Sequence, residues 1–415
     1  MRKLLALFGA SHPLWRAPHR PLFFCAGLWA LIAPTVWLWP EGMIVDPVAW
    51  HLRALLFGMG GAAVGGYLLT ALPSWTGSPP TSPQAVRALT LLWAAAQLAG
   101  LAIPGLPDAL HLLPSLAFFG LLAVILARGL IAARVFSKLW SVVAVLGLAL
   151  GDAVSLCGGV GEPWATRAPL AMVFLFAALI GVIGGRAVPA FTASWMQHTS
   201  SRLRPRKWPV LSPLALIATL LGAGLTLANH TLAAGLCLLI AGVVQLARLL
   251  GWYSWQSRHY PALLVLHLAW VWLPVGLILL GLATLRPDVL AQGTALHALT
   301  MGAMGSMIIA IAGRAAMARR GNLLIVGGGL GAAFGLVWSA ALLRVASPRV
   351  TGPGFDGITA SALLWMLGWA LFLWAYRPAL SGDIPWPILS ARRAASQQVG
   401  QVTTPSQNPA NPESR

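Results

Sequence analysis

The sequence predicts an all-α polytopic membrane protein with about twelve transmembrane helices. Hydrophobic residues make up 58% of the 415 residues and charged residues only 9%, whereas soluble chains average about 25% charged residues. The apolar residues fall in long runs separated by short polar joints, as in segments that cross a bilayer as helices. This composition excludes a soluble enzyme, a nucleic-acid-binding domain and a disordered chain.

The runs define the expected spans, because a helix needs roughly 20 residues to cross a hydrocarbon core of about 30 Å. Twelve runs qualify within a membrane domain over residues 21–376, and they cover residues 21–39, 48–72, 85–103, 109–130, 137–157, 165–188, 209–229, 231–250, 261–284, 289–313, 322–343 and 358–376. Residues 1–20 are polar and basic and are expected to form a cytoplasmic N-terminal segment. Residues 377–415 turn rich in Gln, Asn, Ser and Pro, which predicts a disordered cytoplasmic tail.

The formal net charge of +18 is explained by loop charges and does not indicate a nucleic-acid partner. With the N-terminus in the cytoplasm, most of the 27 Lys and Arg residues fall in cytoplasmic loops, as the positive-inside rule expects. Six of the nine acids then fall outside, namely Glu41, Asp46, Asp108, Glu162, Asp288 and Asp356. The charges therefore favour twelve spans with both termini cytoplasmic.

Three of the expected spans end in similar glycine motifs. The marks are Gly66 in the second span, Gly185 in the sixth and Gly313 in the tenth. They are four spans apart, so one interpretation is a fold of three repeats of four helices. The other interpretation is chance, because glycine pairs are common in membrane helices.

Ionisable residues inside spans are costly and mark candidate functional sites. The expected spans contain five of interest: His51, Arg53, Asp152, His267 and His297. His51 lies 15 residues before Gly66, and His297 lies 16 residues before Gly313. At 1.5 Å per residue both lie about 22–24 Å from the cytoplasmic ends of their helices. Two imidazoles at one depth can ligate one haem or share a metal ion, and His267, nearer the inner leaflet, can serve a second centre.

Each candidate also has a structural interpretation. The three histidines can form hydrogen bonds between helices, and Arg53 can extend its guanidinium to the interface or hold a carboxylate such as a haem propionate. Arg186 and Arg314, at the inner ends of their spans, are either anchoring charges or anion-binding groups. Asp152 is the one acid well inside a span, and it is either a proton-relay group or a water-facing residue near the end of its helix.

Several stretches of the chain resemble the NnrS family of bacterial membrane proteins. They are residues 46–51, 56–58 and 68–80 in and after the second span, residues 184–192 at the end of the sixth, and residues 296–305 in the tenth. His267 and Arg314 fit the same pattern, and the likeness covers about residues 10–376. Each motif alone is weak, whereas their combination is specific.

The resemblance implies a twelve-span protein of the bacterial inner membrane that contains haem and copper and acts in nitric oxide metabolism or the nitrosative stress response. Haem is the expected cofactor and copper the second. The expected partners are the lipid bilayer, nitric oxide and a respiratory-chain donor. His51, His267 and His297 match family histidines and are the preferred ligand candidates, and the resemblance leaves the reaction open.

The sequence departs from the family at two places. Where the family usually reads Trp-His-x-His-Glu-Met-Leu-Phe-Gly, this chain has Arg53, Ala54 and Leu55 in place of the second His, the Glu and the Met. Where the family has His-Thr-Gly after the tenth span, this chain has Arg319-Arg320-Gly321. A protonated guanidinium does not bind a metal, so either one haem remains where two centres are expected, or the chain is a divergent paralogue.

Two other classes of function fit the twelve spans. A solute or metal transporter without a redox cofactor fits the span count and the repeat, although a chain of intramembrane acids, common in proton-coupled transporters, is missing from the sequence. An assembly factor for a respiratory enzyme is the other alternative. A bound haem separates the first hypothesis from both.

Overall fold

The computed structural model describes residues 12–383 apart from 41–42, 45, 102–107, 158–162, 200, 207, 322, 351, 353 and 355. Helices occupy all twelve of the expected ranges, and ten helical segments among the described residues are long and apolar enough to cross a membrane. The protein is therefore a polytopic α-helical membrane protein. Residues 1–11 of the expected N-terminal segment and residues 384–415 of the expected tail lie outside the described residues.

A short helix, η1 (Pro13–Arg16), precedes the helices that occupy the first six expected ranges. The elements that build them are α2 (His19–Ile32) with η2 (Ala33–Leu38), α3 (Pro47–Arg53) with η3 (Ala54–Met59) and α4 (Gly60–Thr76), α5 (Pro83–Ala99), α6 (Asp108–Ala132), η4 (Phe136–Lys138) with α7 (Trp140–Cys157), and α8 (Pro163–His198). Prolines at the first turns of α3 and α5, each after an acidic or hydroxyl N-cap residue, explain where these two helices begin.

The other six expected ranges are also occupied by helices. Their elements are α9 (Leu211–Leu227), α10 (Thr231–Leu250), η5 (Ser254–His259) with α11 (Pro261–Leu285), α12 (Gln292–His297) with η6 (Ala298–Gly305), α13 (Ser306–Gly313) and η7 (Arg314–Ala316), α14 (Gly328–Val350), and α15 (Gly357–Tyr376) with η8 (Arg377–Leu380). The 17-residue helices α5 and α9 are about 26 Å long at 1.5 Å per residue, so they are slightly shorter than the hydrocarbon core.

Two spans contain a π-helical segment at corresponding places. The second span changes from α3 through the π-helical η3 into α4, and the tenth changes from α12 through the π-helical η6 into α13. His51 lies in the last turn before η3, and His297 is the last residue before η6. The sixth span, α8, is assigned as α-helix throughout. The second and tenth spans therefore share a feature that α8 lacks.

The eleventh span begins later than its sequence indicates. The expected range started at residue 322, but β1 (Ala318–Arg320) and β2 (Leu323–Ile325) form an antiparallel hairpin there. Gly321 takes φ +60 in the turn, a conformation that glycine adopts at little cost. The helix α14 begins at Gly328 and extends to Val350, so its C-terminal end lies seven residues beyond the expected limit.

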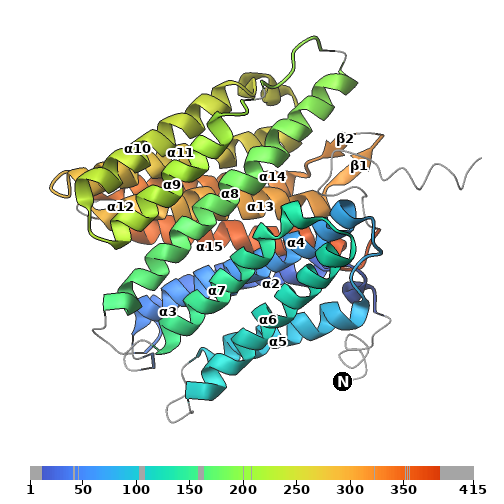
Figure 1. The fold of residues 1–415 in the computed structure, drawn as a ribbon, viewed down its shortest axis with the longest axis horizontal. Coiled ribbons are helices and arrows are strands. Elements are labelled where there is room, and N and C mark those ends of the chain that lie inside the picture. The colour runs from blue at the N-terminus through green and yellow to red at the C-terminus, as the bar shows by residue number, and fades with distance from the viewer. Residues whose placement is uncertain are drawn as a thin grey trace, which may run out of the picture.

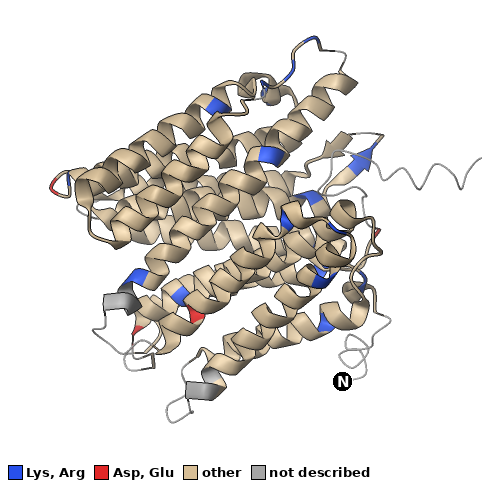
Figure 2. Ribbon diagram, in the orientation of Figure 1, with Lys and Arg blue, Asp and Glu red and all other residues tan. Residues whose placement is uncertain are grey.

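The helices form one elongated bundle (Figure 1). The helices α9, α10 and α11 pack on one another at one edge, and α5 and α6 lie at the other. The first and last spans meet, because α2 packs against α15. Figure 2 shows that most Lys and Arg residues lie at the end of the bundle that carries β1 and β2. The placement of charge along the sequence thus corresponds to one basic end in space.

The ends of the described bundle are joined by hydrogen bonds. The guanidinium of Arg20 donates to the carbonyls of Pro13, Leu380 and Gly382, and the Tyr376 hydroxyl donates to the carbonyl of His19 at 2.8 Å. The chain therefore enters and leaves the bundle at the same end, which requires an even number of crossings.

Candidate functional site

The structure places His51 and His297, from distant parts of the chain, at the same end of the bundle. The two imidazoles are half-buried, and the helices that carry them, α3 and α12, both lie away from the end with β1 and β2. The ring of Trp37 lies 5.8 Å from the His51 ring, centroid to centroid. The two spans with π-helical segments thus carry their histidines at the end of the bundle opposite the basic end.

Both histidines are held by one ring nitrogen and leave the other without a partner. The His297 Nδ1 atom lies 2.6 Å from the carbonyl oxygen of Gly293, and the His51 Nδ1 atom makes a long contact of 3.5 Å with the carbonyl oxygen of Ala33. Because a carbonyl only accepts, Nδ1 carries the proton in each neutral ring, and Nε2 keeps its lone pair. Neither Nε2 atom has a hydrogen-bond partner among the described residues. Metal-binding histidines usually have this arrangement, with Nδ1–H donated to a carbonyl or carboxylate.

Arg344 is the cation of this site. It lies in α14, which packs against both α12 and η6, the two elements that meet at His297. The guanidinium donates a 3.4 Å hydrogen bond to Ser347 on its own helix. The site therefore combines two imidazole nitrogens with one nearby guanidinium.

Sequence reasoning missed Arg344 because of the error in the eleventh span. The expected range ended at residue 343, which placed Arg344 in an outer loop. The observed helix continues to Val350, so the side chain is half-buried on a helix. The available signal was the position of Arg344 itself, because an arginine one residue beyond an expected span can lie on the same helix as the span.

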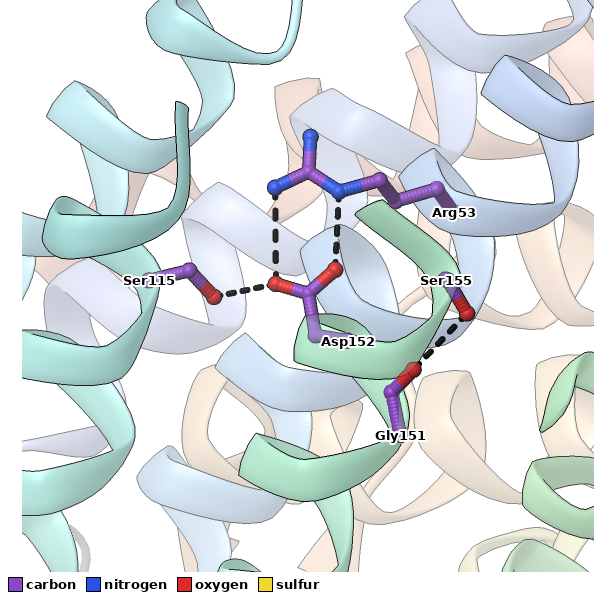
Figure 3. A network of polar contacts seen from close by, with 5 residues as sticks. All are labelled: Arg53, Ser115, Gly151, Asp152 and Ser155. Atoms are coloured by element: carbon purple, nitrogen blue, oxygen red, sulfur yellow. Dashed lines mark hydrogen bonds and ion pairs between the residues drawn. The ribbon is translucent and has the colours of Figure 1, made fainter. Parts of the chain in front are cut away.

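Arg53 and Asp152 form a buried ion pair beside the histidine site (Figure 3). The Arg53 Nε atom lies 2.7 Å from Oδ1 of Asp152, and the two side chains are 13% and 2% exposed. A second contact joins Arg53 Nη2 to Oδ2 at 3.4 Å, and the Ser115 hydroxyl also donates to Oδ2. The pair links α3 to α6 and α7. Arg53 thus neither extends to the interface nor lies free to bind a ligand, and Asp152 does not face water.

His267 lies in a different environment from the histidine pair. It is buried at 2% exposure, with Nε2 2.9 Å from the Thr192 hydroxyl and Nδ1 2.8 Å from the Ser254 hydroxyl. The two hydroxyl groups also bond backbone carbonyls, Thr192 that of Val188 and Ser254 that of Leu249. Both ring nitrogens are therefore occupied by the protein, as the hydrogen-bonding interpretation of this residue expects.

Arg186 and Arg314, the two arginines expected at the inner ends of their spans, differ in their exposure. Arg186 is exposed on α8, whereas Arg314 is 6% exposed and its guanidinium lies 4.0 Å from the centroid of the Phe191 ring. A third arginine, Arg248, is 4% exposed and donates to Gln245 Oε1 at 2.6 Å. Two tryptophan rings, those of Trp252 and Trp270, lie against it. Neither Arg186 nor Arg314 approaches the histidine pair.

The two imidazoles of His51 and His297 fit a cofactor that itself supplies most of the ligands of its metal. Among the described residues, no group of three or more His, Cys, Asp or Glu side chains lies close enough to hold a metal ion. Two imidazoles alone leave a bare metal ion short of its usual ligands. A haem supplies the equatorial ligands itself and takes imidazole as an axial ligand, so the two free Nε2 atoms fit a haem better than a bare ion.

The fold and this site define a class: a polytopic α-helical membrane protein with a pair of half-buried histidines at one end of the bundle. The family model described as NnrS protein matches residues 13–383. The chain belongs to the NnrS protein family, as the motifs around His51 and His297 predicted. No curated protein matches the sequence.

Proposed function

We propose that this protein binds haem in the bacterial inner membrane and acts in nitric oxide metabolism or the nitrosative stress response. His51 and His297 are the proposed ligands. The observation that carries the proposal is the pair of imidazoles with Nδ1 on a backbone carbonyl and Nε2 without a partner. Membership of the NnrS family supports the physiological part of the proposal.

In this proposal each residue of the site has a separate role. A bound haem would supply an iron centre that takes small ligands and exchanges electrons. The carbonyls of Ala33 and Gly293 fix the tautomer of the two histidines and orient their rings. Arg344 offers a guanidinium to an acidic substituent of the ligand.

The proposed topology has twelve spans and both termini in the cytoplasm. The basic end of the bundle in Figure 2 supports a cytoplasmic location for that end. The meeting of the first and last spans through Arg20 supports an even count. The short helices α5 and α9 complete the twelve if the bilayer thins locally around them, which costs a fraction of a kcal/mol per Å.

An absorption spectrum of protein purified from haem-replete cells tests the proposal. We expect a Soret band in the unaltered protein and its loss or strong reduction in His51→Ala and in His297→Ala. His267→Ala is the matched control, because both of its ring nitrogens bond hydroxyl groups, and we expect it to retain the band.

Metal analysis of the same samples separates haem from copper. Stoichiometric copper without a Soret band, lost on replacement of either His51 or His297, would assign the pair to copper and contradict the haem proposal. Protein with neither haem nor copper that moves a solute across proteoliposomes would favour the transporter alternative.

A further inference from the structure

A partly open pocket of about 70 Å³ lies between helices of the bundle, apart from the histidine pair. Its walls come mainly from three helices: α4, α8 and the η6–α13 segment, with Phe23 of α2 closing one side. These are the second, sixth and tenth spans, the three that carry the glycine marks in the sequence. Helices that are far apart in the chain therefore converge around one space.

Glycines set how closely these helices approach. A side chain at Gly60 would meet Phe176, and it would lie 2.7 Å from the Met304 methyl group. At Gly184, a Cβ atom would lie 3.0 Å from the Trp270 ring and 3.4 Å from the Met307 methyl group. The helices are in close contact at these points, and the cavity is the space that remains between them.

The lining of the cavity is apolar. It consists of aliphatic and aromatic side chains with Met304 and Met307, and Tyr67 is the one lining residue that carries a hydroxyl group. A buried water needs two to four polar partners, so this space disfavours water. Methionine side chains adapt to different shapes, which suits a wall that opens for an occupant.

Size and location define the occupant. An engineered apolar cavity of about 150 Å³ stays dry and binds benzene or xenon, and the present cavity has roughly half that volume. Its three main helices lie within candidate membrane spans, so an occupant would reach it from the bilayer.

We infer that the convergence of α4, α8 and α13 is a binding site for one small, uncharged, lipid-soluble molecule smaller than benzene, a class that includes dissolved diatomic gases. Met304 lies seven residues beyond His297, about 10 Å along the helix at 1.5 Å per residue. The site is thus separate from the histidine pair, and it does not depend on a bound haem.

Xenon is the probe for this site. In protein labelled with ¹³C at the methionine methyl groups and placed in lipid nanodiscs, we expect rising xenon pressure to shift the Met304 and Met307 resonances saturably. The exposed Met43, at 54% exposure, is the internal control and should show only the unsaturated shift that xenon dissolved in lipid produces.

Variants that fill the cavity complete the test. Ile180→Phe and Ile308→Phe, which enlarge two lining residues, should abolish the saturable shift. Ile217→Phe, which adds the same side chain at a position 60% exposed on the outer surface, should leave it unchanged. Saturable shifts that persist in both filled variants, a response at Met304 no different from that at Met43, or displacement of xenon by added fatty acid would overturn the inference.

Discussion

At the scale of single residues, the Arg53–Asp152 pair explains how two charges are tolerated inside the bundle. A buried charge without a partner costs several kcal/mol, and each member of this pair neutralises the other. Asp152 also accepts a hydrogen bond from the Ser115 hydroxyl. Because Arg53 lies two residues after His51, the same contacts also fix the helix that carries the histidine.

Breaking the pair should destabilise the protein strongly. We expect Asp152→Asn to lower the free energy of unfolding by about 3–5 kcal/mol, because it leaves the Arg53 guanidinium buried without an anion. The double variant Arg53→Gln with Asp152→Asn should lose much less, because both charges are gone. Denaturant titration in mixed micelles measures these differences.

The exposed pair Arg286–Asp288 is the matched control. Its N···O distance is 2.8 Å and both side chains are more than 60% exposed. Neutralising Arg286 and Asp288 should leave the free energy of unfolding nearly unchanged, because solvent screens an exposed pair. A cost for Asp152→Asn no larger than that of the exposed pair would contradict the role given to the buried one.

At the scale of elements, the π-helical segments distinguish the second and tenth spans. π-Helical turns are rare and occur often at functional sites. In both spans the π-helical segment follows the histidine. A glycine in each segment lies against a tryptophan side chain. The Trp93 indole donates to the Gly58 carbonyl at 2.8 Å, and a Cβ atom at Gly302 would lie 2.5 Å from the Trp272 ring.

Glycine at residue 302 should therefore be required for close packing. We expect Gly302→Ala to destabilise the protein by about 1–3 kcal/mol, because the new methyl group forces the Trp272 ring to move. The measurement is the thermal midpoint in nanodiscs. Gly335→Ala is the control: it lies on α14 with no atom within 4 Å of the added Cβ, so it should be neutral or stabilising through helix propensity, by up to about 1 kcal/mol. Equal losses in the two variants would contradict the packing argument.

At the scale of the whole molecule, charge is sorted between the ends of the bundle. The basic end in Figure 2 also contains the junction of the first and last spans through Arg20. The opposite end contains the histidine site, Arg344 and Asp356. If the basic end is cytoplasmic, the histidine site lies toward the outer face of the membrane.

The native Cys157 tests this orientation, because it is exposed at the end of α7, on the side of the bundle opposite the basic end. In a variant with Cys25→Ala and Cys237→Ala, we expect a membrane-impermeant maleimide to label Cys157 in intact spheroplasts. Leu203→Cys in a background without native cysteines lies in the loop after α8 and should be labelled only after permeabilisation. The reverse pattern would show the opposite orientation.

The sequence alone determined the class of fold and the positions of most of the helices. These follow from a local constraint, because each helix that crosses the bilayer must be long and apolar. The start of α14 was missed because a short hairpin precedes it.

Only the tertiary structure decided which residues of these helices meet. Sequence spacing gives depth along a helix but says nothing of which helices are neighbours or how each is rotated. The bundle pairs Arg53 with Asp152, encloses His267 between two hydroxyl groups and packs the helix that carries Arg344 against the span that carries His297. The same packing brings the three glycine-marked spans around one apolar cavity. Contacts between helices depend on the shape of the whole bundle, and no local pattern in the chain encodes that shape.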